Sequence, residues 1–200
     1  MMKAIKRLLD VIGSVVLLIV LCPVLLLIAI LIKIDSAGSI FFIQRRLGLY
    51  GVEFNMFKFR TMVTNAEQIG TGLFSYENDP RITKFGKMIR SISLDELPQL
   101  LNVFLGDMSL VGPRPPVVYE LGNYSDFDAS LKYRFVMKPG ITGLSQVSGR
   151  NDLDWTEKIV YDRQYIENFK KIGILEDIRI LLKTISVILS MDGVIEKRKI

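Results

Sequence analysis

Residues 11–32 read VIGSVVLLIVLCPVLLLIAILI, a run of 22 residues without a charged side chain. A helix rises about 1.5 Å per residue, so this stretch would measure about 33 Å and reach across the hydrocarbon core of a bilayer. From Lys33 onward the composition is that of an ordinary globular domain, and the chain is long enough to bury its own hydrophobic core. The sequence therefore predicts one membrane segment joined to one folded domain.

Two features of this segment argue against a straight crossing. Pro23 lies inside the apolar run, where a proline removes a backbone donor and kinks a helix. Basic residues flank the run on both sides, which favours a cytoplasmic location for both ends; these residues are Lys3, Lys6, Arg7, Lys33, Arg45, Arg46, Lys58 and Arg60. A re-entrant helix hairpin that dips into one leaflet satisfies both observations, and a kinked single span is the alternative. We accordingly predict a membrane segment over residues 1–34 and a membrane-associated cytoplasmic domain over residues 35–200.

The residues that are missing restrict the chemistry. The chain of 200 residues has no histidine and a single cysteine, Cys22, which lies within the apolar run. Imidazole catalysis, histidine-ligated zinc and an intramolecular disulfide are thereby excluded. Acid–base chemistry falls to carboxylates, lysine or tyrosine, and a metal would be a hard cation such as Mg²⁺ held by oxygens. The net charge of +5 is too small to indicate nucleic acid, but beside a membrane segment it suits anionic headgroups or phosphorylated ligands.

The pattern after residue 34 predicts an α+β domain that is mostly helical. Residues 39–47 and 54–62 have the character of strands and are joined by a glycine-bounded turn, which indicates a short β-hairpin. Helices are expected over residues 83–92, capped by Thr83, and 93–104, where Ser93 and Glu96 fit a capping box. The last forty residues have an apolar helical face that suits either core packing or an interfacial helix on the membrane, with Glu176 on the opposite, polar face.

Several polar residues are candidates for chemistry. Asp95 and Glu96 are adjacent acids at a predicted helix start, where a carboxylate can bind Mg²⁺ or attack phosphorus, although acids there are also common caps. Arg114 stands between two prolines and Arg150 between a glycine and an asparagine, so each is either a phosphate clamp or an ordinary surface arginine. Four cations recur every third residue without an intervening acid, and we expect them to contact phosphate or headgroups; they are Arg81, Lys84, Lys87 and Arg90.

Five motifs stand in order along the chain: KFRTM at 58–62, SLDELPQL at 93–100, GDMSLVGPRP at 106–115, KPGITG at 138–143 and GRN at 149–151. Together they closely resemble the bacterial sugar transferase family, the monotopic polyprenol-phosphate phosphoglycosyl transferases, in its minimal form. The resemblance covers nearly the whole chain, including the membrane segment. The family's helix break is a Ser-Pro pair, where this chain has Cys22-Pro23.

The resemblance implies an enzyme of the bacterial inner membrane whose domain faces the cytoplasm. It would transfer a sugar 1-phosphate from a nucleotide diphosphate sugar, usually UDP-linked, to undecaprenyl phosphate. Asp95 would be the nucleophile and would lie near Mg²⁺, with Glu96 as its partner that assists deprotonation of the lipid phosphate. Arg114 and Arg150 would hold phosphates, with Arg90 and Lys58 supporting the site. Membrane lipid is an implied partner and nucleic acid is not, and the oligomeric state is left open.

Two other functions remain compatible with the residues alone. One is a Mg²⁺-dependent phosphatase of polyprenyl diphosphates, which would release inorganic phosphate without a sugar nucleotide. The other is a membrane-anchored module without enzymatic activity, whose basic face binds anionic lipid.

Overall fold

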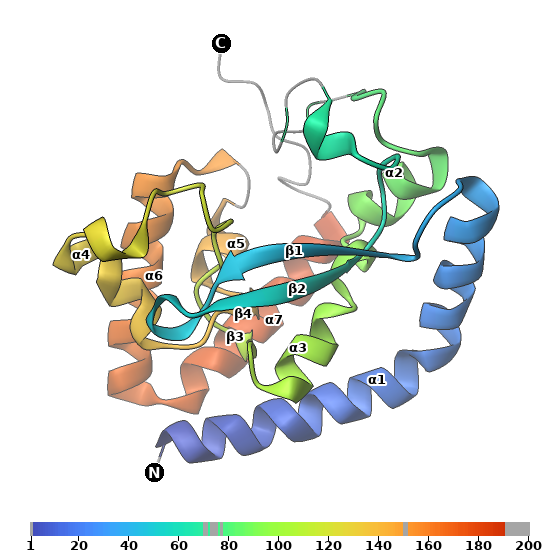
Figure 1. Ribbon diagram of the computed structural model, residues 1–200. Helices are drawn as coiled ribbons and strands as arrows, with labels where there is room; N and C mark the ends of the chain where they lie inside the picture. Colours follow the sequence, from blue (N-terminus) through green and yellow to red (C-terminus); the bar gives the residue numbers. More distant parts are fainter. Residues whose placement is uncertain (1, 70–71, 73–75, 77, 150–151, 191–200) are drawn as a thin grey trace.

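The computed structural model describes residues 2–69, 72, 76, 78–149 and 152–190 (Figure 1). It confirms the predicted fold class: a long apolar N-terminal helix is joined to a small α+β domain that is mostly helical. The helices are α1 (Met2–Asp35), α2 (Lys84–Ser91), α3 (Gln99–Leu105), α4 (Ala129–Tyr133), α5 (Leu144–Ser148), α6 (Trp155–Ile172) and α7 (Ile174–Ser190). The strands are β1 (Phe41–Leu47), β2 (Glu53–Phe59), β3 (Ser109–Val111) and β4 (Gly140–Thr142). Short 3₁₀ turns include η2 (Ala66–Gln68), η3 (Leu94–Glu96) and η5 (Arg134–Val136).

Helix α1 is one continuous helix that bends partway along its length, as Figure 1 shows. Pro23 lies inside it and accounts for the bend, because a proline cannot supply the backbone donor of its turn. Among the described residues, α1 is the one helix long and apolar enough to cross a membrane. Only 11% of its most apolar window is buried in the protein, so its side chains face outward as those of a membrane segment do, unlike a core helix.

The N-terminal part of α1 is attached to the domain by buried polar contacts. Lys6 donates to the Asp177 carboxylate of α7 at 2.6 Å. The two carboxylate oxygens of Asp10 accept from the Ser109 hydroxyl at 2.8 Å and from the Leu110 backbone N–H at 2.9 Å. These bonds join the first turns of α1 to β3 and α7, far along the chain.

The other end of α1 is attached to the same domain. The Arg60 guanidinium, at the end of β2, donates to the carbonyl oxygens of Ser36 at 2.7 Å and Ala37 at 2.8 Å. It thereby supplies hydrogen-bond donors to the two carbonyls that directly follow the last residue of α1. Ile32 and Ile89 are buried in one cluster, which packs α1 against α2. Both ends of the bent helix therefore contact one domain.

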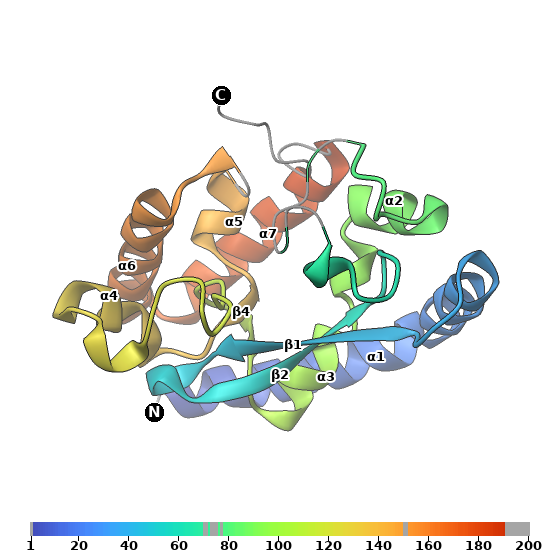
Figure 2. The same ribbon diagram turned by 45° about the horizontal axis from the view of Figure 1, so that its top comes forward.

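Two small sheets form the strand layer. The predicted hairpin is confirmed: β1 pairs antiparallel with β2 in the register Phe41 to Phe59 through Leu47 to Glu53. A second, parallel pair joins β3 to β4, which the sequence did not predict. In Figure 2 the helices α5, α6 and α7 are drawn above the hairpin, and most of α1 runs beneath and behind it.

The segment between α2 and α3 differs from the sequence prediction. Thr83 caps α2 as expected, since its side chain accepts from the Gly86 N–H. Ser93, however, is left-handed at φ 58° and makes no side-chain cap, so the predicted capping box and the helix over 93–104 are wrong. A 3₁₀ turn over residues 94–96 and a separate helix after Pro98 replace them. The reason is that the Glu96 carboxylate is bonded to distant cations and does not reach back to its own turn.

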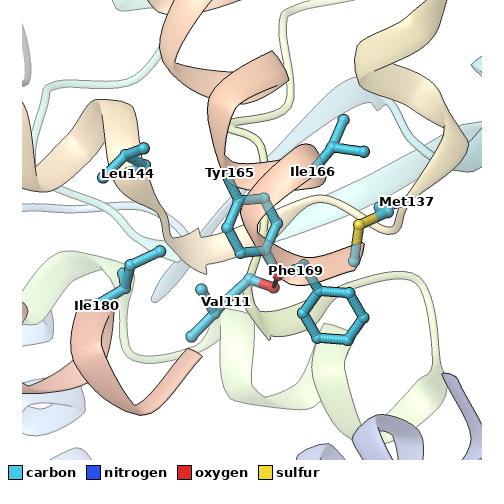
Figure 3. Packing of buried hydrophobic residues seen from close by; sticks show 7 residues of the cluster. All are labelled: Val111, Met137, Leu144, Tyr165, Ile166, Phe169 and Ile180. Atoms are coloured by element: carbon cyan, nitrogen blue, oxygen red, sulfur yellow. Dashed lines mark hydrogen bonds between the residues drawn. The ribbon is translucent and has the colours of Figure 1, made fainter. Parts of the chain in front are cut away.

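The main core lies between α5, α6, α7 and the β3–β4 pair (Figure 3). Its buried side chains are Val111, Met137, Leu144, Tyr165, Ile166, Phe169 and Ile180. Helix α7 contributes Ile180 and the buried acid Glu176, so the side that faces the core is not the side that the apolar pattern indicated. Leu175, Leu182 and Leu189 on the predicted apolar face are 64–77% exposed. These three leucines therefore do not pack in the core, and an interfacial helix stays a prediction.

The close approach of the Gly112 and Gly140 backbones, beside the β3–β4 pair, generates a stability prediction. A Cβ atom added to Gly140 would lie 2.0 Å from the backbone nitrogen of Gly112, so no side chain fits there. We expect Gly140→Ala to lower the free energy of unfolding by about 3 kcal/mol or more. Gly122→Ala is the control, because its Cβ would meet nothing within 4 Å and only its φ of 91° adds strain, of about 1–2 kcal/mol. Thermal unfolding in detergent micelles measures both variants. Equal losses of thermal stability would contradict the close approach of the two backbones.

Candidate active site

A cavity of about 1190 Å³ opens between the β-hairpin, α2, η3, α5 and α7. Five of the six site residues proposed from the sequence line it: Lys58, Arg90, Asp95, Glu96 and Arg114. The sixth, Arg150, lies outside the described residues. The cavity therefore gathers side chains from β2, α2, η3 and the turn after β3.

Strand geometry brings one row of the hairpin to this cavity. Successive side chains of a strand alternate between faces, so Phe42, Gln44 and Arg46 share one face of β1. Lys58 of β2 pairs with Phe42 in the register and lies on the same face. All four line the cavity. The period of two in a strand is a signal in the sequence that would place Arg46 on the same face as Lys58. The basic charge pattern alone assigns Arg46 only to the flank of the apolar run.

Glu96 connects three segments that are far apart in the sequence. Its Oε1 atom accepts from the Lys58 ammonium at 2.8 Å and lies 3.3 Å from a guanidinium nitrogen of Arg114. Burial by itself would raise the pKa of Glu96, but the charges and hydrogen bonds of these two cations hold that pKa well below its usual range. Glu96 therefore stays ionised at all ordinary pH values and acts as the shared anion of the site.

Asp95 has the opposite electrostatic character. Burial raises the pKa of Asp95 to about 6, and the neighbouring Glu96 charge also raises it, while Lys58 and Arg90 lower it. Among the described residues, no cation forms an ion pair with Asp95 within 4 Å. Above pH 6 this side chain is an ionised carboxylate, so its oxygens are available to a metal ion or to an electrophilic phosphorus.

Burial also lowers the pKa of Lys58, as do the nearby Arg114 and Arg46, whereas Glu96 raises it. Arg114 is less enclosed, with 31% of its side chain exposed toward the cavity. These cations can neutralise the oxygens of a diphosphate, which is the main electrostatic requirement for attack at phosphorus.

One member of the predicted row of cations has a different role. Arg81 is buried, with 5% of its surface exposed, and its guanidinium is paired with Asp79 at 2.7 Å. It also donates to the carbonyl oxygens of Ala66, Ile69 and Gly72 at 2.7–2.8 Å. The prediction that Arg81 contacts phosphate is therefore wrong, because the loop before α2 consumes its donors.

The carboxylates present suit Mg²⁺ better than a metal that needs many protein ligands. The described residues contain no group of three or more His, Cys, Asp or Glu side chains able to hold a metal. Mg²⁺ commonly takes one or two carboxylates and completes its shell with substrate phosphates and water. Asp95 meets this requirement, since Glu96 already shares its charge with two cations.

The bent apolar helix and the cavity together indicate a membrane-associated protein with a site suited to phosphorylated ligands. The chain belongs to the bacterial sugar transferase family, whose sequence profile matches residues 1–191. It is 41% identical, over a 205-residue alignment, to the undecaprenyl-phosphate galactose phosphotransferase of Salmonella typhimurium; the alignment covers 96% of this chain and 42% of that protein. It is 45% identical over 199 residues to the galactosyl transferase CpsE of Streptococcus agalactiae, covering 94% of this chain and 43% of the relative.

A third relative is similar in length to this chain. The exopolysaccharide production protein ExoY of Rhizobium meliloti is 40% identical over 197 residues, which cover 92% of this chain and 84% of ExoY. The chain thus spans less than half of the Salmonella and Streptococcus proteins but most of ExoY.

The environment of Asp95 can be measured directly. In protein labelled with carboxyl-¹³C aspartate, we expect the Asp95 signal, identified by its loss in Asp95→Asn, to titrate at a pH of about 6. Lys58→Met should move this titration to higher pH, because the Lys58 charge lowers the pKa of Asp95. Lys87→Met, at another lysine that lines the cavity, should leave it unchanged. A midpoint near 4, insensitive to Lys58, would contradict the burial of this carboxyl group.

Proposed function

We propose that this protein transfers a sugar 1-phosphate from a UDP-linked sugar to undecaprenyl phosphate through a covalent intermediate on Asp95. The main support is the position of the acidic pair. Leu94, the residue before Asp95, packs against the cluster that contains Ile28 and Ile32 of α1, so the acids lie next to the apolar helix. The other face of the same turn opens into the cation-lined cavity. A soluble diphosphate and a lipid phosphate could meet at such a site.

In the first half-reaction, a carboxylate oxygen of Asp95 attacks the phosphorus that carries the sugar. The bond from that phosphorus to the oxygen bridging the two phosphates breaks, and UMP leaves with the bond's electrons. Asp95 is then an acyl phosphate esterified to the sugar. Lys58, Arg90 and Arg114 line the cavity beside this position and would balance the charge on the phosphate oxygens.

In the second half-reaction, an oxygen of undecaprenyl phosphate attacks the same phosphorus. The bond between phosphorus and the Asp95 oxygen breaks, which releases undecaprenyl diphosphate-sugar and regenerates the carboxylate. Asp95 is the nucleophile of the first half and the leaving group of the second, so donor and acceptor phosphates can occupy the same cation-lined space in turn.

Mg²⁺ is part of the proposal, and Asp95 is the side chain that would hold it. When bound, the ion would offset charge on the diphosphate of the donor. Asp95, Lys58 and Arg114 remain the protein groups that orient the phosphate.

The contacts of Glu96 favour a role other than the general base that the family resemblance implies. A carboxylate whose pKa lies far below neutral binds a proton poorly and is a weak base. Its oxygen instead holds Lys58 and Arg114 toward each other. We propose that Glu96 acts by positioning these two cations around the transferred phosphate.

The membrane placement follows from α1. Both ends of the bent helix contact one domain, while its apolar surface faces outward. The exposed leucines of α7, together with Leu105 of α3 at 64% exposure, add apolar surface on the domain itself. We propose that α1 enters one leaflet and returns, with the domain on the cytoplasmic side, where nucleotide sugars occur.

The covalent step provides a direct test. On mixing with Mg²⁺ and either UDP-galactose or UDP-N-acetylgalactosamine, whose sugars are named in relatives, we expect intact-mass spectra to show one added sugar phosphate. Asp95→Asn should form no adduct and lose at least about 10³-fold in turnover, measured as UMP release with undecaprenyl phosphate. Asp126→Asn, at an exposed aspartate away from the cavity, is the matched control and should behave as the native protein does.

Three outcomes would count against this proposal. An unchanged adduct on Asp95→Asn would remove Asp95 as the nucleophile. Release of inorganic phosphate from undecaprenyl diphosphate without a sugar nucleotide would favour a phosphatase. Lipid binding with no turnover on any UDP-sugar would favour a module without enzymatic activity.

The re-entrant arrangement predicts a labelling pattern in cells. In a Cys22→Ala background, Lys3→Cys lies in the first turn of α1, Ala37→Cys lies just after its last residue, and Ser125→Cys reports on the domain; all three positions are exposed. An impermeant maleimide should leave all three unlabelled in intact cells and label all three after permeabilisation. Labelling of Lys3→Cys alone in intact cells would show that α1 crosses the membrane.

A further inference from the structure

The turn that presents Arg114 is held by its carbonyl oxygens. Three of its four residues, Pro113, Pro115 and Pro116, have no backbone N–H, so the turn can form few hydrogen bonds as a donor. Each carbonyl from 113 to 116 nevertheless has a donor. The Gly140 N–H reaches Pro113 at 3.0 Å and the Leu47 N–H reaches Pro116 at 3.1 Å.

The two central carbonyls are bonded by arginine side chains. Arg134 donates to the carbonyl oxygen of Arg114 at 2.6 Å, and Arg46 donates to that of Pro115 at 2.8 Å. Prolines restrict φ on both sides of Arg114, and these bonds fix the orientation of the peptide planes. The Arg114 guanidinium is therefore the mobile part of a backbone that is otherwise fixed.

Arg134 is itself held tightly by α6. It is 2% exposed, and its guanidinium pairs with Asp162, 1% exposed, at 2.7 Å. The Trp155 ring covers the guanidinium, with its centre 4.9 Å from the guanidinium carbon. Ser145 donates to the other oxygen of Asp162 at 3.2 Å. The position of the guanidinium nitrogen that donates to the Arg114 carbonyl is thus fixed by Asp162 and by the Trp155 ring.

A buried ion pair contributes little net stability compared with well-packed apolar side chains, because both charges lose their hydration. The pair does fix the orientation of the Arg134 guanidinium, which points one of its nitrogens at the backbone carbonyl of Arg114. Arg134 lies behind the turn, outside the set of described residues that line the cavity, so its position does not suit contact with a substrate.

We infer that Arg134, fixed by Asp162 and Trp155, is a positioning residue that acts through Arg114. By holding the backbone of Arg114, it sets where the Arg114 side chain begins and points that side chain toward Glu96 and the proposed phosphate site. This inference rests on the proposed function, since Arg114 must bind a phosphate for its position to affect the reaction.

A double-mutant cycle tests the inference. Arg134→Lys keeps a charge opposite Asp162 but cannot span both the carboxylate and the Arg114 carbonyl with a planar fork. We expect it to lower kcat/KM for UDP-sugar by about tenfold or more, since small misplacements of a binding group are costly. In an Arg114→Gln background the same substitution should have no further effect on kcat/KM.

Two further variants separate positioning from general stability. Arg134→Met with Asp162→Leu removes both buried charges together, so the fold keeps no unpaired charge, and it should reproduce the loss of kcat/KM while the thermal midpoint stays close to that of the native protein. Arg163→Lys, at an exposed arginine of α6, should leave kcat/KM unchanged in either background.

The outcomes distinguish failure of this inference from failure of the proposed function. If the native protein transfers sugar phosphate but the Arg134 effect is equally large with Gln at position 114, Arg134 does not act through Arg114 and the inference is wrong. If the native protein transfers nothing, the proposed function is wrong, and the positioning role is wrong with it.

Discussion

The site depends on one carboxylate oxygen that two cations share. Lys58 and Arg114 both point at Glu96 Oε1, and with Arg46 close by these positive charges would otherwise repel one another. The same contact joins the β-hairpin, the turn that carries the acids and the turn that follows β3. Because Glu96 supplies this charge, Asp95 beside it makes no ion pair within the part of the chain that the structure describes. Two adjacent acids thus acquire different environments, and burial with charge pairing is the physical cause of the difference.

The apolar helix is part of the architecture of the site as well as an anchor. Buried polar bonds attach its beginning to β3 and α7, and Arg60 attaches its end to β2, two residues from Lys58. Leu94 continues the contact from the helix to the acidic pair. The position of the apolar helix and the position of the proposed phosphate-binding side chains are therefore set by the same few residues, which suits the proposed reaction between a soluble and a lipid-bound phosphate.

The sequence predicts those parts of the fold that local patterns determine. A long uncharged run with one proline gives a bent apolar helix, a glycine-bounded turn between two extended stretches gives the hairpin, and Thr83 caps its helix as its residue type suggests. Ser93 and Glu96 matched a local capping pattern, yet Glu96 is bonded to residues 38 and 18 positions away, and no local rule contains those partners. The three-residue strands β3 and β4 are too short for a periodic signal and depend on a pairing across thirty residues. The proposed role of Arg134 could not be predicted for the same reason. It depends on contacts with Arg114 and Asp162, which are distant in the sequence.

The packing around Arg134 has a practical consequence for spectroscopy. Trp155 is the single tryptophan of the chain, and it lines the cavity, donates to Glu120 and covers the arginine that holds the Arg114 turn. Indole emission is sensitive to nearby charge and to changes in hydration. The protein therefore carries one indole fluorophore, placed at the cavity where the proposed substrates would bind, and its signal reports on that location without interference from any other tryptophan.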